Sequence, residues 1–112
     1  EENMAQNFRN QITSATGTGA TVILAEADSY DAVIGIRCTN IVSSAINIDV
    51  YIVRSAANYY LIKTAPIPTG SSLELIDSGS KVVLASGDKI TAVSDTASSL
   101  DTAVSYIDTI ST

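Results

Sequence analysis

Apolar and polar residues alternate along most of this chain in short runs. The clearest run covers residues 45–54. Its apolar side chains share one parity: Ile46, Ile48, Val50 and Ile52. A period of two residues is typical of a β-strand that buries one of its faces. The pattern therefore predicts a strand over 45–54, in which Ile48 and Val50 point into the core.

Seven further runs have the length and the residue types of strands, and short polar segments separate them. They cover residues 21–26, 32–42, 59–65, 73–76, 81–85, 89–94 and 100–110. Turns that recur at this spacing are typical of two packed antiparallel sheets.

Two of the connecting segments carry specific turn signals. Proline lacks an N–H group and is excluded from central strands, so we expect the segment with Pro66 and Pro68 to cross between two sheets. The sequence Asp77-Ser-Gly-Ser80 has the composition of a tight turn. It predicts that the runs before and after it form a hairpin.

The β-branched residues determine the predicted fold class. The chain has 14 Ile, 9 Val and 12 Thr against 6 Leu, which favours pleated sheets over helices. We predict an all-β fold, an antiparallel β-sandwich that is Ig-like or jelly-roll-like, with about eight strands. A small closed barrel is the alternative architecture. The length fits one domain, which we place at residues 20–112.

Residues 1–19 are mostly polar and end in Thr16-Gly-Thr-Gly19, which predicts a flexible N-terminal arm. The sizeable apolar side chains of the arm are Met4, Phe8 and Ile12. We expect the arm to become ordered against another chain, with Phe8 and Ile12 as partner-binding anchors. Its removal is expected to leave the sandwich folded. The polar start of the chain lacks the pattern of a signal peptide.

Charge and residue types exclude several functions. The net charge is −6 with six Lys and Arg, so we expect no nucleic-acid groove. Without His and with one Cys, the chain lacks the residues for Ser-His-Asp or Cys-His catalysis, for His-based or Cys-rich metal sites and for an internal disulfide. We expect no cofactor, no metal and no enzymatic activity. Cys38 lies in an apolar run and is expected to be buried. No apolar run has the length of a membrane-spanning helix.

The acidic residues near turns are weak candidates for a metal site. Asp28 and Asp31 lack the alternation of Asp, Asn and Gly that a calcium loop requires, and we expect them to be solvated. Asp77 and Asp88 stand beside glycines in tight turns, and we expect their carboxylates to cap local backbone N–H groups.

Tyr51, Tyr59 and Tyr60 lie close together around one predicted hairpin. Tyrosines can form a platform that binds a partner or a sugar, because they offer rigid amphipathic area. They can equally form a cross-strand aromatic pair that stabilises the sheet. Both interpretations stay open at this point.

Three segments in the second half of the chain carry a resemblance to known proteins. They are Tyr59-Tyr-Leu-Ile-Lys-Thr-Ala-Pro-Ile-Pro-Thr-Gly-Ser-Ser-Leu-Glu-Leu, Lys81-Val-Val-Leu-Ala-Ser-Gly-Asp-Lys-Ile and Ala97-Ser-Ser-Leu-Asp-Thr-Ala-Val-Ser-Tyr-Ile. In this series of strands and turns the chain resembles small β-sandwich virion proteins of tailed bacteriophages, including those of cyanophages. The resemblance extends over residues 12–110 and contains no active site.

The resemblance implies a structural protein of the virion. Such a protein would be a capsid decoration (cement) protein or a neck, tail or fibre accessory. It would form homo-oligomers and have other virion proteins as partners. The alternative function is a carbohydrate or cell-surface binding module that uses Tyr51, Tyr59 or Tyr60 to bind a glycan.

Overall fold

The computed structural model describes residues 7–24, 31–76 and 82–108, and these ranges contain nine β-strands and no helix. The strands are β1 (Asn7–Thr16), β2 (Thr21–Leu24), β3 (Asp31–Asn40), β4 (Ile46–Arg54), β5 (Ala57–Ile67), β6 (Ser72–Ile76), β7 (Val82–Leu84), β8 (Lys89–Ser94) and β9 (Leu100–Asp108). All the strands that alternation predicted are present, and their ends differ by a few residues from the predicted ones.

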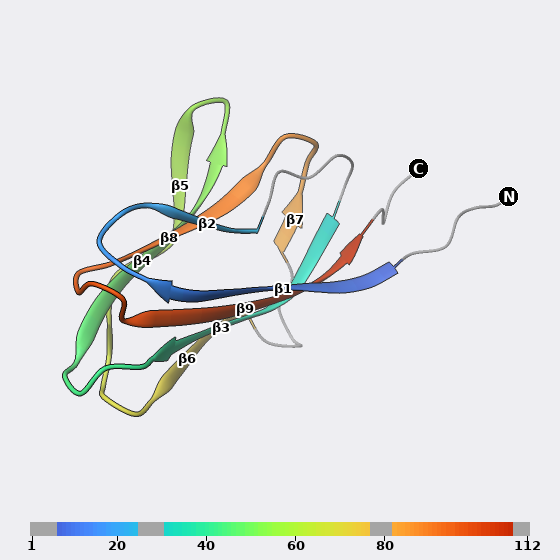
Figure 1. The fold of residues 1–112 in the computed structure, drawn as a ribbon. Coiled ribbons are helices and arrows are strands. Elements are labelled where there is room, and N and C mark those ends of the chain that lie inside the picture. The colour runs from blue at the N-terminus through green and yellow to red at the C-terminus, as the bar shows by residue number, and fades with distance from the viewer. Residues whose placement is uncertain (1–6, 25–30, 77–81, 109–112) are drawn as a thin grey trace, which may run out of the picture.

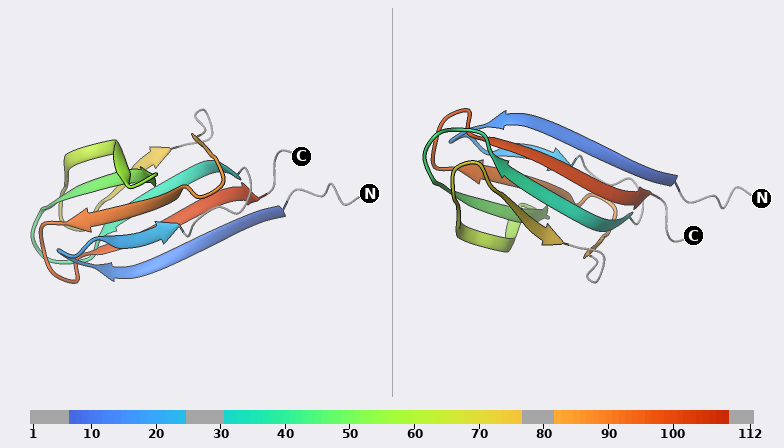
Figure 2. Two further views of the ribbon diagram at one scale, coloured as in Figure 1. Left: turned by 90° about the horizontal axis from the view of Figure 1, so that it is seen from above. Right: turned by 90° about the horizontal axis from the view of Figure 1, so that it is seen from below.

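Two antiparallel sheets pack face to face (Figures 1 and 2). Sheet A has the order β1-β9-β3-β6, and β7 also pairs with β3. Sheet B has the order β2-β8-β4-β5. Except at β4–β5 and β6–β7, consecutive strands lie in opposite sheets, which is the connectivity of a jelly roll. The structure therefore confirms the predicted antiparallel β-sandwich of the jelly-roll type.

Aliphatic side chains fill the space between the two sheets. The largest fully buried ones are Ile23, Leu24, Ile36, Ile46, Ile48, Ile67, Leu84, Ile90, Leu100, Val33, Val50 and Val104. Ile48 and Val50 are 1% and 0% exposed, which confirms the predicted parity of β4. Each buried branched side chain contributes roughly 1.5–3 kcal/mol, so this layer holds the two sheets together.

Residues 7–16 differ from the prediction of a flexible arm, because they form the edge strand β1. It pairs antiparallel with β9 from Asn7 opposite Asp108 to Thr16 opposite Leu100. Its inner-face side chains are polar: Arg9, Gln11 and Thr13. The N-terminal end of β1 extends beyond sheet B, so no apolar layer faces it (Figures 1 and 2). Main-chain hydrogen bonds hold such an edge strand, and alternation of apolar residues does not reveal it.

The predicted hairpin between β6 and β7 is wrong. Both strands pair antiparallel with β3, so they run in the same direction along one edge of sheet A. β6 lies against Ile36–Thr39, and β7 lies against Asp31–Val33. They are two segments of one edge strand, and residues 77–81 between them lie outside the described ranges.

Pro66 lies inside β5, whereas the sequence had predicted that the strand ends before it. Its place opposite Asn47 is compatible with a strand because β5 is an edge of sheet B, where a missing N–H group leaves no ladder bond broken. The chain then crosses from sheet B to sheet A between Ile67 and Ser72, which confirms that the crossing lies at this segment.

Candidate interaction surfaces

The outer face of sheet A carries the two most exposed large apolar side chains of the described residues. Phe8 and Ile12 on β1 are 76% and 72% exposed. Phe8 lies opposite Ile107 of β9, and Ile12 lies opposite Ala103. Residues four apart on a strand share a face, so both predicted anchors belong to one surface. Met4 lies outside the described ranges.

The apolar character of this face continues to the opposite edge of sheet A. Ile107 lies opposite Ala32 of β3, and Ala32 lies opposite Val83 of β7. Directly opposite residues point to the same side of a sheet. Phe8, Ile107, Ala32 and Val83 therefore form a row across the outer face, and Val83 at its end is 54% exposed.

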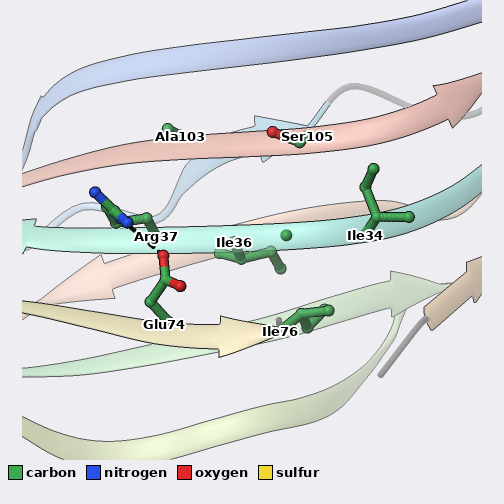
Figure 3. Close-up of a pocket in the computed structure, with 8 residues that line it drawn as sticks. Ile34, Ile36, Arg37, Glu74, Ile76, Ala103 and Ser105 are labelled. Carbon is green, nitrogen blue, oxygen red and sulfur yellow. Dashed lines mark hydrogen bonds and ion pairs between the residues drawn. The ribbon is translucent and has the colours of Figure 1, made fainter. Parts of the chain in front are cut away.

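An open depression lies beside this row (Figure 3). The small residues Gly35, Ala103 and Ser105 line it together with Ile34. Ile34 is part of an irregularity in β3, where the register with β9 shifts between residues 33 and 35. Small side chains between larger ones leave a hollow in this face, and a protruding side chain of a partner can fill it.

Polar groups border the depression on the side away from Ile34 (Figure 3). Arg37 Nε donates a hydrogen bond to Glu74 Oε2 at 2.8 Å, and both side chains are half exposed. A second depression, next to Phe8 and Asn10, shares Ile34 and Ser105 with the first. The two depressions are therefore neighbours on sheet A.

The three candidate tyrosines do not form one exposed platform. Tyr51 lies directly opposite Tyr60, their ring centroids are 5.0 Å apart, and Tyr51 is only 9% exposed. Lys63 Nζ lies 4.5 Å from the ring centroid of Tyr60. Tyr51 and Tyr60 thus form the cross-strand aromatic pair, which leaves little of the Tyr51 ring accessible, and the partner-binding role of the tyrosines stays a prediction. Tyr59 and Tyr60 keep 57% and 46% of their surface exposed.

Asp88 is a buried carboxylate with a structural role. It accepts the backbone N–H of Ala85 at 2.9 Å, which confirms the predicted turn cap. It also accepts hydrogen bonds from Arg54 Nε at 2.9 Å and from Arg54 Nη2 at 2.5 Å. The hydrogen bond from Arg54 holds the pKa of Asp88 below its usual value. The contact joins residues 34 positions apart, and no sequence signal pointed to it.

Asp49 and Asp95 line a third open depression, on sheet B. Asp95 accepts the backbone N–H of Asn47 at 3.1 Å, and this hydrogen bond is the main cause of its lowered pKa. Asp49 accepts the backbone N–H of Thr64 at 2.7 Å. Both carboxylates therefore satisfy backbone groups. Within the described ranges, no three His, Cys, Asp or Glu residues lie together in a way that could hold a metal ion.

The remaining sequence candidates have simple outcomes. Cys38 is fully buried, and burial raises the pKa of its thiol to about 12, so the thiol stays protonated at neutral pH. Asp31 is the buried first residue of β3, which corrects the expectation of a solvated turn residue. Asp28 and Asp77 lie outside the described ranges. In the part of the chain that the structure describes, no helix is long and apolar enough to span a membrane.

Comparison with solved structures supports the fold through one match with a TM-score above 0.5. No protein-family profile and no curated protein matches the sequence. The structure is similar to a protein of the Bacillus endospore appendages, described as a family of disulfide-linked pili, with a TM-score of 0.55 and 14% identity over 96% of this chain and 88% of that chain. It is also similar to a mutant VP2 protein of infectious bursal disease virus in derived T=1 particles, with a TM-score of 0.46 and 10% identity over 90% of this chain and 32% of that chain.

Proposed function

We propose that this protein is a non-enzymatic structural component of a tailed-phage virion, a capsid decoration or cement protein or a neck or tail accessory. The observation that carries the proposal is the exposed apolar surface on sheet A, which contains Phe8 and Ile12. Large apolar side chains gathered on a rigid face are typical of surfaces that contact another protein. The protein would act by such contacts and would need no cofactor.

The fold and the sequence resemblance support this role. The fold of this chain is similar to that of the Bacillus pilus protein. This architecture therefore suits a protein that serves as a repeated building block. In the present sequence the single cysteine, Cys38, is enclosed in the core. Copies of this chain would therefore be joined by non-covalent contacts. The segments that resemble β-sandwich virion proteins support a virion in particular.

The proposal is tested by following the protein into particles. Purified phage particles from a producing culture are analysed by mass spectrometry, and the protein is located on them with a labelled antibody. We expect a fixed copy number per particle. The Phe8→Ser, Ile12→Ser double variant should enter particles poorly, and the matched variant Tyr59→Ser on sheet B should enter normally. A protein absent from purified particles would refute the virion assignment.

A carbohydrate-binding role is the second candidate. It is supported by the exposure of Tyr59 and Tyr60 on β5. One face of the Tyr60 ring lies against Tyr51, and Lys63 approaches the same ring, so a smaller aromatic surface is offered than three free tyrosines would give. A glycan array distinguishes the candidates, because binding that Tyr59→Ala abolishes would favour a glycan module over the proposed contacts on sheet A.

A further inference from the structure

The sandwich has four edges, and three of them carry features that oppose pairing with another strand. β2 is only four residues long. β5 contains Pro66, has two irregularities in its register with β4, and has a positive φ of 52° at Thr64. The edge opposite β1 is divided into β6 and β7, of five and three residues. Short, proline-containing or irregular edges are the usual protection against strand addition.

Over residues 7–13, β1 has none of these features. Its irregular part is confined to the C-terminal end, where the register shifts between Thr13 and Thr16 and Ala15 has a positive φ of 55°. The strand is ten residues long, contains no proline, and keeps a regular register with β9 from residue 7 to residue 13. In a chain of net charge −6, residues 7–16 contain no Asp or Glu and one charged residue, Arg9. Repulsion between two acidic copies is therefore small at this edge. Every second residue of an edge strand directs its N–H and C=O groups away from the sheet, where another strand can bind them.

We infer that two copies of this chain pair through their β1 edges, antiparallel and about a two-fold axis at Asn10. The occupant is a second β1 because the other edges are short or interrupted. A two-fold axis perpendicular to the sheet keeps both outer faces on one side. It joins the two copies of sheet A into one continuous sheet.

The register follows from the side chains of β1. With the axis at Asn10, Phe8 of one copy lies opposite Ile12 of the other, and the reverse pair forms by symmetry. Cross-strand pairs of an aromatic and a β-branched residue stabilise sheets. The same register places Arg9 opposite Gln11. If the two-fold axis lay at Arg9 instead of Asn10, the two Arg9 side chains would lie opposite each other. Charge and apolar matching thus select the same alignment.

This inference deepens the proposed function, since it names the edge through which copies of a structural protein meet. It does not need a particle, so it is tested on the isolated chain. Sedimentation equilibrium should show a dimer. Ile12→Lys should raise its dissociation constant about tenfold or more, because the dimer contains the substituted position twice. Tyr59→Lys, at another exposed side chain, on β5, should leave the dissociation constant unchanged, and circular dichroism checks that both variants fold.

A cysteine variant tests the register. Asn10→Cys places two thiols opposite each other across the axis, at a separation that a disulfide can span. It should form a covalent dimer under mild oxidation, whereas Ser14→Cys, on the same face of β1, should not. Cys38 does not interfere because it is buried. A monomeric chain, or equal cross-linking at both positions, would overturn the inference, and neither result decides whether the protein enters particles.

Discussion

Removing the guanidinium of Arg54 should destabilise the sandwich through Asp88, a buried carboxylate. Asp88 is 1% exposed and accepts three hydrogen bonds, two from Arg54 and one from the Ala85 amide. It connects the turn before β8 with the end of β4. In the variant Arg54→Met the carboxylate stays buried and loses its cationic partner.

The magnitude follows from the exposure of the two partners. Breaking a fully buried ion pair typically costs about 3–5 kcal/mol. The Arg54 side chain is 54% exposed, so water can replace part of the lost interaction. We therefore expect Arg54→Met to lower the free energy of unfolding by about 2 kcal/mol at pH 7, or the melting temperature by about 10 °C. Arg37→Met is the matched control, because Arg37 and Glu74 are both half exposed, and its cost should be below about 0.5 kcal/mol.

The effect should depend on pH with a definite sign. The folded state lowers the pKa of Asp88, so this contribution to stability is present above the unfolded pKa of about 4. It is lost as the pH falls through the lower folded pKa. Urea unfolding followed by circular dichroism should show the full difference between wild type and Arg54→Met at pH 7 and a smaller difference at pH 2. An equal cost at both values, or a cost no larger than that of Arg37→Met, would refute the reasoning.

Four further changes have clear expected outcomes. Val50→Asp should prevent folding, because it buries a charge without a partner in the core. Its thermal melt should then show no cooperative transition. Thr102→Val should stabilise the fold by about 1 kcal/mol in urea unfolding, since the buried Thr102 hydroxyl has no hydrogen-bond partner among the residues that the structure describes. Ser99→Ala should destabilise it, because the Ser99 hydroxyl bonds to Thr96 O at 2.7 Å. Deletion of residues 1–14 should lower the melting temperature, since it removes most of β1 from β9, and an unchanged melt would favour a free arm.

The sequence predicts strands well where they bury one face and poorly where they do not. In β4 the alternation of Ile46, Ile48 and Val50 matches the burial of these residues in the structure. β1 escaped prediction because its apolar residues, Phe8 and Ile12, lie on the outer face and its inner face is polar. Its stability comes from main-chain pairing, which leaves no pattern in the side chains.

The candidate site was predictable to a similar extent. Exposure of Phe8 and Ile12 agrees with their expected availability, while their partner-binding role stays a prediction. The tyrosine cluster was identified, but which ring is covered depends on the register of β4 and β5, and an irregularity between Val50 and Tyr51 sets that register. The sequence did not predict contacts between turns that lie far apart along the chain, such as the contact of Arg54 with Asp88.

The distribution of polar groups explains why recognition is expected on the surface of sheet A. Within the described residues, hydrogen-bonded polar groups in the interior serve the fold: Asp88 caps a turn, and Asn40 Nδ2 donates to the carbonyls of Ser44 and Ile67. Exposed apolar area is costly in water and has no such internal use. The proposed pairing of two β1 strands would bring both copies of Phe8 and Ile12 onto one continuous face. A dimer would then offer a partner the apolar side chains of both copies on one face, at fixed spacing, which suits a protein that binds a repeating lattice.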